Sequence, residues 1–205
     1  MCRRCRREAA RRRVVLILGI DPGTAVTGYG VVRAGATPVL VECGVIRTKA
    51  EWPLPRRLKD IADGVRELLA RHKPQAMAVE AAFYAKNVRT TLVLGHARGV
   101  ILLAGEEAGV EIHEYPPAEI KKAVVGAGAA TKLQVQLMIA QHLRLKTPPQ
   151  PSDAADGVAA ALTCAMRIGT QRALAGARGI GPLLRRVSAA RTGTGATAAT
   201  GRRSK

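Results

Sequence analysis

Apolar residues follow two different periods along this chain, so both strands and helices are expected. The continuous apolar run Val14–Ile20 predicts a strand buried on both faces. Residues 26–33 and 38–46 predict two further strands, and the short connections favour an antiparallel meander of all three. Two more short strands are predicted over Gln75–Glu80 and Val110–Glu114.

Helical spacing alternates with these strands. Residues 55–71 place their apolar side chains on one face, and a longer helix is predicted over 87–108. Gly95 and Gly99 weaken that longer helix, so we expect either close packing against a partner or a break there. Three more helices are predicted over 117–125, over 131–143 with Thr131 as its cap, and over 152–169. The order βββαβαβααα predicts an α/β fold of three layers, with a mixed five-stranded sheet flanked by helices.

The positive charge is concentrated at the two ends of the chain. The formal net charge is +18 over 205 residues, of which residues 1–13 contribute +6 and residues 171–205 contribute +8, so +4 remains for residues 14–170. A basic protein favours a nucleic-acid partner. We expect one domain over 14–172, between a disordered basic extension (1–13) and a disordered, low-complexity basic tail (173–205).

Composition also indicates in which cellular compartment the protein is expected. Four cysteines in a chain of this length do not form a disulfide framework, which favours reduced thiols. No run approaches the roughly 20 apolar residues of a membrane span. The Arg-rich start before Val14–Ile20 imitates a signal peptide, but the apolar run is short and ends in Asp21-Pro22-Gly23. We therefore expect a cytoplasmic protein without a membrane partner.

Four carboxylates stand where strands end or a helix begins. Asp21 follows the first predicted strand, Glu80 ends the fourth, and Asp153 and Asp156 share one face at the start of the last helix. Singly, each has a structural explanation in a turn or at a helix N-terminus. Together they predict a site at the carboxyl edge of the sheet, because clustered acids repel one another unless divalent cations neutralise them.

Five short motifs in order carry a family resemblance. They are Gly19-Ile-Asp-Pro-Gly-Thr-Ala-Val-Thr-Gly-Tyr-Gly-Val31, Phe83-Tyr-Ala-Lys-Asn87, Leu94-Gly-His-Ala-Arg-Gly99, Val124-Val-Gly-Ala-Gly128 and Ser152-Asp-Ala-Ala-Asp156. From about Val14 to Arg167 the chain resembles RuvC, the bacterial Holliday junction resolvases. The resemblance implies an RNase H-like fold.

The resemblance also implies an activity and its partners. A homodimer would nick two opposed strands of a four-way DNA junction by hydrolysis, leaving 5′-phosphate and 3′-hydroxyl ends. The catalytic metal ligands would be Asp21, Glu80, Asp153 and Asp156, holding two Mg²⁺ per subunit, for which Mn²⁺ can substitute. Asp153 stands at a position where some relatives have His. RuvA and RuvB, the branch-migration proteins, are the implied protein partners.

The resemblance extends to contacts with DNA. Phe83 is expected to stack on an unpaired base near the junction, although a core role is an alternative, and Tyr84, which follows it, is a further expected DNA contact. Lys121 and Lys132 match basic positions near the active site. Position alone suggests Lys86 and Arg89 as phosphate contacts; this set therefore comprises Phe83, Tyr84, Lys86, Arg89, Lys121 and Lys132.

Other interpretations remain open at this stage. An ATPase of the actin–Hsp70 superfamily also uses an Asp-x-Gly-Thr turn like Asp21–Thr24, but repeats it in a second domain, and here one copy is found. A junction-binding module without catalysis is the second alternative, against which all four acids argue. The extension 1–13 is either an electrostatic arm for DNA or the product of a start codon placed too early.

Overall fold

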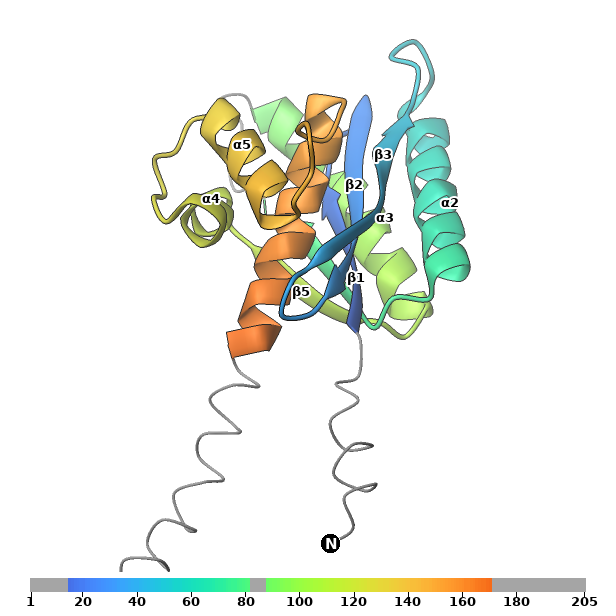
Figure 1. Ribbon diagram of the computed structural model, residues 1–205. Helices are drawn as coiled ribbons and strands as arrows, with labels where there is room; N and C mark the ends of the chain where they lie inside the picture. Colours follow the sequence, from blue (N-terminus) through green and yellow to red (C-terminus); the bar gives the residue numbers. More distant parts are fainter. Residues whose placement is uncertain (1–14, 82–87, 171–205) are drawn as a thin grey trace, which may run out of the picture. The chain divides into compact units, whose positions relative to one another are not determined.

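In the computed structural model, residues 15–81 and 88–170 are described (Figure 1). The predicted disorder of 1–13 and 173–205 falls outside these ranges. So do three of the predicted DNA contacts, Phe83, Tyr84 and Lys86. The domain boundaries at 14 and 172 therefore stay predictions.

The centre of the fold is a mixed five-stranded sheet, as predicted. Its strands are β1 (Val15–Asp21), β2 (Val26–Ala34), β3 (Val39–Arg47), β4 (Ala76–Glu80) and β5 (Glu111–Tyr115), in the spatial order β3-β2-β1-β4-β5. The first three form the antiparallel meander. β4 and β5 run parallel to β1, which requires the helical crossovers that separate them in the chain.

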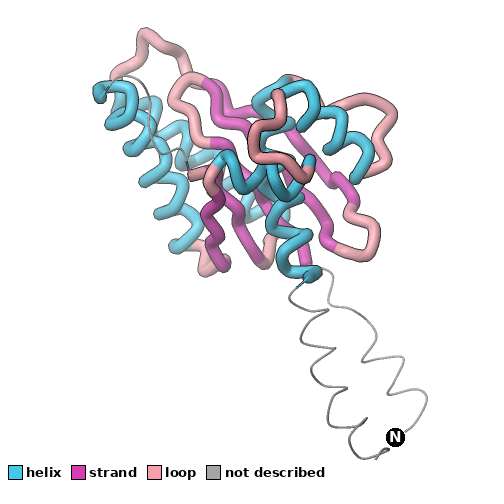
Figure 2. The backbone as a smooth tube through the Cα atoms, turned by 90° about the vertical axis from the view of Figure 1, so that its left-hand side faces the viewer, coloured by secondary structure: helices cyan, strands magenta, loops and turns pink. Residues whose placement is uncertain are grey.

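Helices cover both faces of the sheet, which completes the three layers (Figures 1 and 2). One core lies between the sheet and α2 (Leu54–His72) with α3 (Val88–Glu107). The other lies between the sheet and α4 (Pro117–Val125), α5 (Lys132–His142) and the helix 152–170, drawn in orange in Figure 1. Neighbouring residues of β1 point to opposite cores, Ile17 to the second and Leu18 to the first, as the period of a strand requires.

The long helix α3 is continuous, so the predicted break at its glycines is wrong. Gly95 and Gly99 are exposed, and a Cβ added to either would meet no atom within 4 Å. The other expectation, close packing against a partner, is compatible with that open space. Neither α3 nor any other helix in the described ranges is long and apolar enough to cross a bilayer.

Candidate active site

Two of the predicted site residues end neighbouring parallel strands. Asp21 is the last residue of β1 and Glu80 the last residue of β4. β1 and β4 pair in parallel, with Ile20 opposite Val79. The next residue of each strand is an acid, so Asp21 and Glu80 lie side by side at the same edge of the sheet. The predicted convergence at the carboxyl edge of the sheet is confirmed for this pair.

Glycines bring the third acidic segment onto the same edge. A Cβ on Gly28 of β2 would lie 1.8 Å from the carbonyl oxygen of Asp153, and one on Gly19 of β1 would lie 2.2 Å from the carbonyl oxygen of Gly157. The helix 152–170 therefore lies on β1 and β2 at a distance that only glycine permits. This contact carries Asp153 and Asp156 to the end of β1. Gly19 and Gly28 both stand in the first motif, but their close contact with this helix has no signal in the sequence.

A small hollow of about 180 Å³ lies at this edge. It is lined by three of the acids, Asp21, Glu80 and Asp156, and by two of the predicted basic residues, Lys121 and Lys132. Its apolar walls are Pro117, Ile120, Val135 and Ala159. Asp153 is not among the lining residues. The site is thus a pocket in which carboxylates and ammonium groups face one another.

Two helices supply the lysines. Lys121 lies in α4 and Lys132 is the first residue of α5. The Thr131 hydroxyl accepts from the Gln134 N–H (3.3 Å) and the Gln134 side chain accepts from the Thr131 N–H (2.8 Å), a capping box that confirms Thr131 as the cap. A fixed helix start holds Lys132 at the rim of the hollow.

Mutual repulsion and burial act on the two strand-end acids. Burial raises the pKa of Asp21 to about 8, with further contributions from the charges of Glu80, Asp156 and Asp153, while Lys132 opposes the shift. Burial also raises the pKa of Glu80, as does Asp156, against the opposing effect of the two lysines. These shifts mean that burial and the neighbouring acids disfavour the charged forms of Asp21 and Glu80 by more than the lysines favour them.

Lys132 supplies the closest counter-charge. Its Nζ donates to Asp156 Oδ2 at 2.7 Å, and this hydrogen bond raises the pKa of Lys132. Among the described residues, no group of three or more His, Cys, Asp and Glu side chains is arranged to hold a metal ion as it stands. By chemistry the donor set nevertheless fits a hard divalent cation, because all four acids offer oxygen and they are close enough to perturb the pKa of Asp21. Lys132 engages only Oδ2 of Asp156, so the other oxygen of that carboxylate takes no part in this ion pair.

The free energy of unfolding of the metal-free protein should depend on pH through the ionisation of the Asp21 carboxyl. Its folded pKa is about 8 against an ordinary 3.8, so the folded state binds more protons between these values. The free energy of unfolding should therefore fall as pH rises from about 4 to 8. In EDTA, Asp21→Asn should be more stable than wild type at pH 8, and the difference should vanish at pH 4. Thermal melts at several pH values test this, and an equal difference at every pH would contradict it.

The remaining predicted DNA contacts have different outcomes. Lys121 and Lys132 line the small hollow. Arg89 is exposed in the first turn of α3. Phe83, Tyr84 and Lys86 fall between β4 and α3, outside the described residues, and their roles stay predictions.

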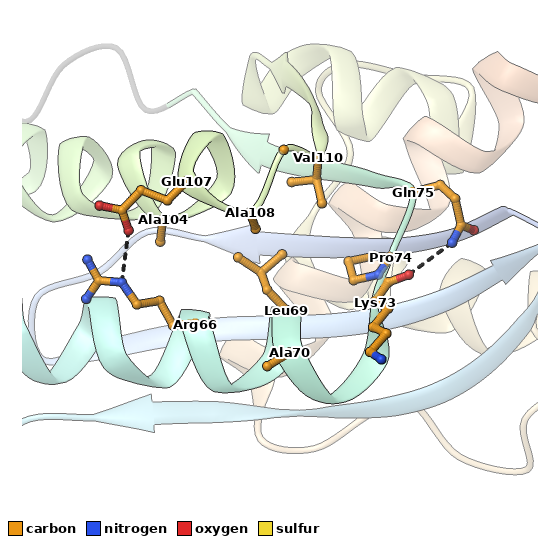
Figure 3. Close-up of a pocket in the computed structure, with 11 residues that line it drawn as sticks. Arg66, Leu69, Ala70, Lys73, Pro74, Gln75, Ala104, Glu107, Ala108 and Val110 are labelled. Atoms are coloured by element: carbon orange, nitrogen blue, oxygen red, sulfur yellow. Dashed lines mark hydrogen bonds and ion pairs between the residues drawn. The ribbon is translucent and has the colours of Figure 1, made fainter.

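A larger hollow, of about 690 Å³, shares no lining residue with the acidic one (Figure 3). It opens between the C-terminal ends of α2 and α3, and its lining includes Pro74 and Gln75 before β4 and Val110 before β5. These residues stand at the amino ends of β4 and β5, whereas the acids lie at the carboxyl edge of the sheet. Arg66 Nε donates to Glu107 Oε2 at 3.0 Å there, so two of the hollow's three charged residues pair with each other, and it holds no cluster of acids. We therefore place the chemistry at the smaller hollow.

Comparison with known proteins identifies relatives over most of the chain. The family model described as crossover junction endodeoxyribonuclease RuvC matches residues 17–164. A protein of that name from Moorella thermoacetica is 52% identical over 151 residues, which cover 72% of this chain and 89% of the relative. The protein of the same name from Pelotomaculum thermopropionicum is 47% identical over 149 residues, covering 72% and 91%.

Solved structures give the same result. Thermus thermophilus RuvC in complex with a Holliday junction substrate superposes with a TM-score of 0.71 at 39% identity, covering 76% of this chain and 97% of that one. The yeast mitochondrial Holliday junction resolvase Ydc2 superposes with a TM-score of 0.55 at 12% identity, covering 73% and 77%, a likeness of fold alone. The residues matched by the family model, 17–164, include all four acids.

Proposed function

This chain belongs to the RuvC family of crossover junction endodeoxyribonucleases, with their RNase H-like fold, and we propose that it resolves Holliday junctions by Mg²⁺-dependent hydrolysis at the acidic edge of its sheet. The observation that supports this most is the convergence of three acids from three separate segments, Asp21, Glu80 and Asp156, on one small basic-rimmed hollow, with Asp153 close enough to raise the pKa of Asp21. Family membership sets aside the actin–Hsp70 type of ATPase. Products with 5′-phosphate and 3′-hydroxyl ends are part of the proposal.

The four acids are proposed to hold the metal. Asp21 and Glu80 are fixed by paired strands, and Asp153 and Asp156 by the glycine-packed helix, so the ligands come from rigid elements. We propose two Mg²⁺ per subunit, with Mn²⁺ as a substitute. When bound, these ions supply positive charge at the phosphate and lower the pKa of the attacking water. Their charge would also restore ionisation of Asp21, whose pKa is raised in their absence.

The two lysines are proposed to bind the phosphate backbone beside the cut. Lys121 lines the pocket and forms no ion pair with the described residues, so its ammonium is available to a phosphate oxygen. Lys132 is engaged with Asp156 and becomes available when that acid turns to a metal. Arg89, Phe83, Tyr84 and Lys86 are proposed as further DNA contacts, the two aromatic rings by stacking on an unpaired base.

The proposed homodimer has a suitable surface on α3. Val88, Leu92 and Leu103 have exposed fractions of 77%, 61% and 53%. Their spacing, together with the open positions Gly95 and Gly99, forms one stripe along the helix. The stripe borders an apolar hollow of about 470 Å³ that also includes Leu58 of α2. Two copies of α3 crossing at the glycines would cover the stripe in a twofold contact.

Charge on the α3 stripe should break the dimer. Leu92→Glu should convert the protein to a monomer in sedimentation equilibrium, because two carboxylates would be buried at the twofold axis without partners. Paired nicking of a junction should be lost, and single nicks should remain. Leu137→Glu is the matched control, since Leu137 of α5 is 53% exposed and lies outside the stripe. A dimer that persists in Leu92→Glu would place the interface elsewhere.

The cellular setting follows the family. We propose that the chain acts in the cytoplasm on junctions held by RuvA and RuvB. The direct test of the whole proposal is cleavage of a synthetic four-way junction by the full chain, with Mg²⁺ and with EDTA. Symmetric nicks that require Mg²⁺ are expected. Junction binding without cleavage would instead support the non-catalytic module.

A further inference from the structure

A basic loop with the chain's one tryptophan lies at the same edge of the sheet as the acids. β3 runs parallel to β1, because each is antiparallel to β2, so both strands end at that edge. The segment after β3 projects from this end of the fold and leads into α2 (Figure 1). It carries Lys49 and Trp52, and Arg56 follows in the first turn of α2. We call Lys49, Trp52 and Arg56 the basic loop cluster.

Hydrogen bonds fix this loop to the turn that follows Asp21. The Thr48 N–H donates to the Ala25 carbonyl at 3.0 Å, and the Thr48 hydroxyl donates to the Thr24 carbonyl. Arg57 Nε in turn donates to the Thr48 hydroxyl oxygen at 3.1 Å. The loop is therefore held against the β1–β2 turn, three to four residues after the Asp21 ligand position.

The cations of this region stand at the unfavourable end of a helix and form no ion pair with an acid in the described ranges, including the exposed Glu51 of the same loop. Arg56 and Arg57 occupy the first turn of α2, which contains no acid, although a helix N-terminus favours negative charge. In the described part of the chain, neither forms an ion pair, nor does Lys49. Basic residues further along the same helix, in contrast, form ion pairs with acids. These pairs are Lys59 with Asp63, Arg66 with Asp63 and Glu107, and Arg71 with Glu42 and Glu67.

Trp52 organises the unpaired cations. The Arg56 guanidinium carbon lies 4.0 Å from the centre of the Trp52 ring, and Lys49 Nζ lies 5.4 Å from it. Such cation–π contacts restrict the long side chains before any ligand arrives, which lowers the entropy lost on binding. Lys49 and Arg56 remain exposed, whereas Trp52 is partly buried between them. The cluster is thus an ordered pair of positive charges that no acid of residues 15–81 or 88–170 neutralises in an ion pair.

We propose that the basic loop cluster binds the phosphate backbone of one duplex arm of the junction. Lys49 and Arg56 contact phosphates, and Trp52 is a positioning residue that holds Arg56. This rests on the proposed function, because the arm reaches the cluster only when the branch point lies at the acidic edge. A planar guanidinium group can donate two hydrogen bonds to the oxygens of one phosphate, and duplex DNA presents phosphates at regular spacing.

Salt dependence of binding tests the two cations. In EDTA, a fluorescently labelled four-way junction is titrated with the full chain by anisotropy at several salt concentrations. Lys49→Ala combined with Arg56→Ala should reduce the slope of log K against log[salt] by about 1.8, and the affinity at 0.1 M salt by well over tenfold. Lys59→Ala, which removes a cation already paired with Asp63 on the same helix, should change the slope by less than about 0.3. Equal slopes in wild type and the double variant would overturn the proposal.

Trp52 itself provides a second readout. It is the chain's single Trp, so intrinsic tryptophan fluorescence reports on this loop alone. Saturating junction should change that fluorescence in EDTA, and Trp52→Phe should keep most of the affinity that Trp52→Ala loses. No spectral change at saturation would overturn the proposal. Cleavage assays distinguish failure of this proposal from failure of the proposed nuclease function. Normal junction cleavage with unchanged slopes would contradict only the role of the basic loop cluster. A changed slope without Mg²⁺-dependent cleavage would contradict only the nuclease function.

Discussion

Asp21→Asn should abolish Mg²⁺-dependent cleavage of a four-way junction while leaving junction binding within about twofold of wild type or tighter. Asp21 lies at the centre of the acidic site, since Glu80, Asp156 and Asp153 all act on its pKa. Loss of this ligand removes several kcal/mol of transition-state stabilisation, which corresponds to a rate at least about a thousandfold lower. The amide does not add negative charge, so phosphate contacts made elsewhere persist.

Single-turnover cleavage and anisotropy on the same junction measure both quantities. Asp63→Asn is the matched control: it makes the same substitution at an exposed acid of α2, where Asp63 pairs with Lys59 and Arg66. It should cleave at the wild-type rate. A second readout is the melting temperature, which Mg²⁺ should raise in wild type and much less in Asp21→Asn. Wild-type cleavage by Asp21→Asn would remove this residue from the mechanism.

The part of the site built from strands was predictable from sequence for a simple reason. Apolar runs that end in an acid place that acid at the carboxyl edge, and parallel neighbours share the edge. β1 and β4 meet both conditions, with Asp21 and Glu80 as their last residues. The capping of α5 by Thr131 was likewise a local property, readable from a few adjacent residues.

What sequence could not provide depends on packing between distant segments. The period of a helix says which face is apolar but not that backbone atoms of 152–170 touch β1 and β2 through glycine. The pairing of Lys132 with Asp156 joins residues 24 apart on different helices, a separation with no periodic signal. The basic loop cluster was missed too, although two arginines in an acid-free first helical turn are a signal that sequence contains.

Gly28→Ala should both destabilise the fold and impair cleavage, although it adds one methyl group. The added Cβ would lie 1.8 Å from the Asp153 carbonyl oxygen, well inside contact distance, and that atom belongs to backbone that cannot swing aside. Either β2 or the start of helix 152–170 must move. We expect a loss of about 3 kcal/mol in the free energy of unfolding. For a domain of this size that lowers the melting temperature by roughly 6–12 °C.

Cleavage should fall by more than unfolding explains, because the displaced backbone carries Asp153 and, three residues on, Asp156. A shift of about 1 Å in a catalytic group can reduce the rate about a hundredfold. Rates measured well below the melting temperature of Gly28→Ala isolate this effect. Gly169→Ala is the control in the same helix: Gly169 is exposed with no atom within 4 Å of an added Cβ, so the change should leave cleavage intact and stability equal or higher. If Gly28→Ala melts and cleaves like wild type, the position of the two helix acids does not depend on the glycine contact.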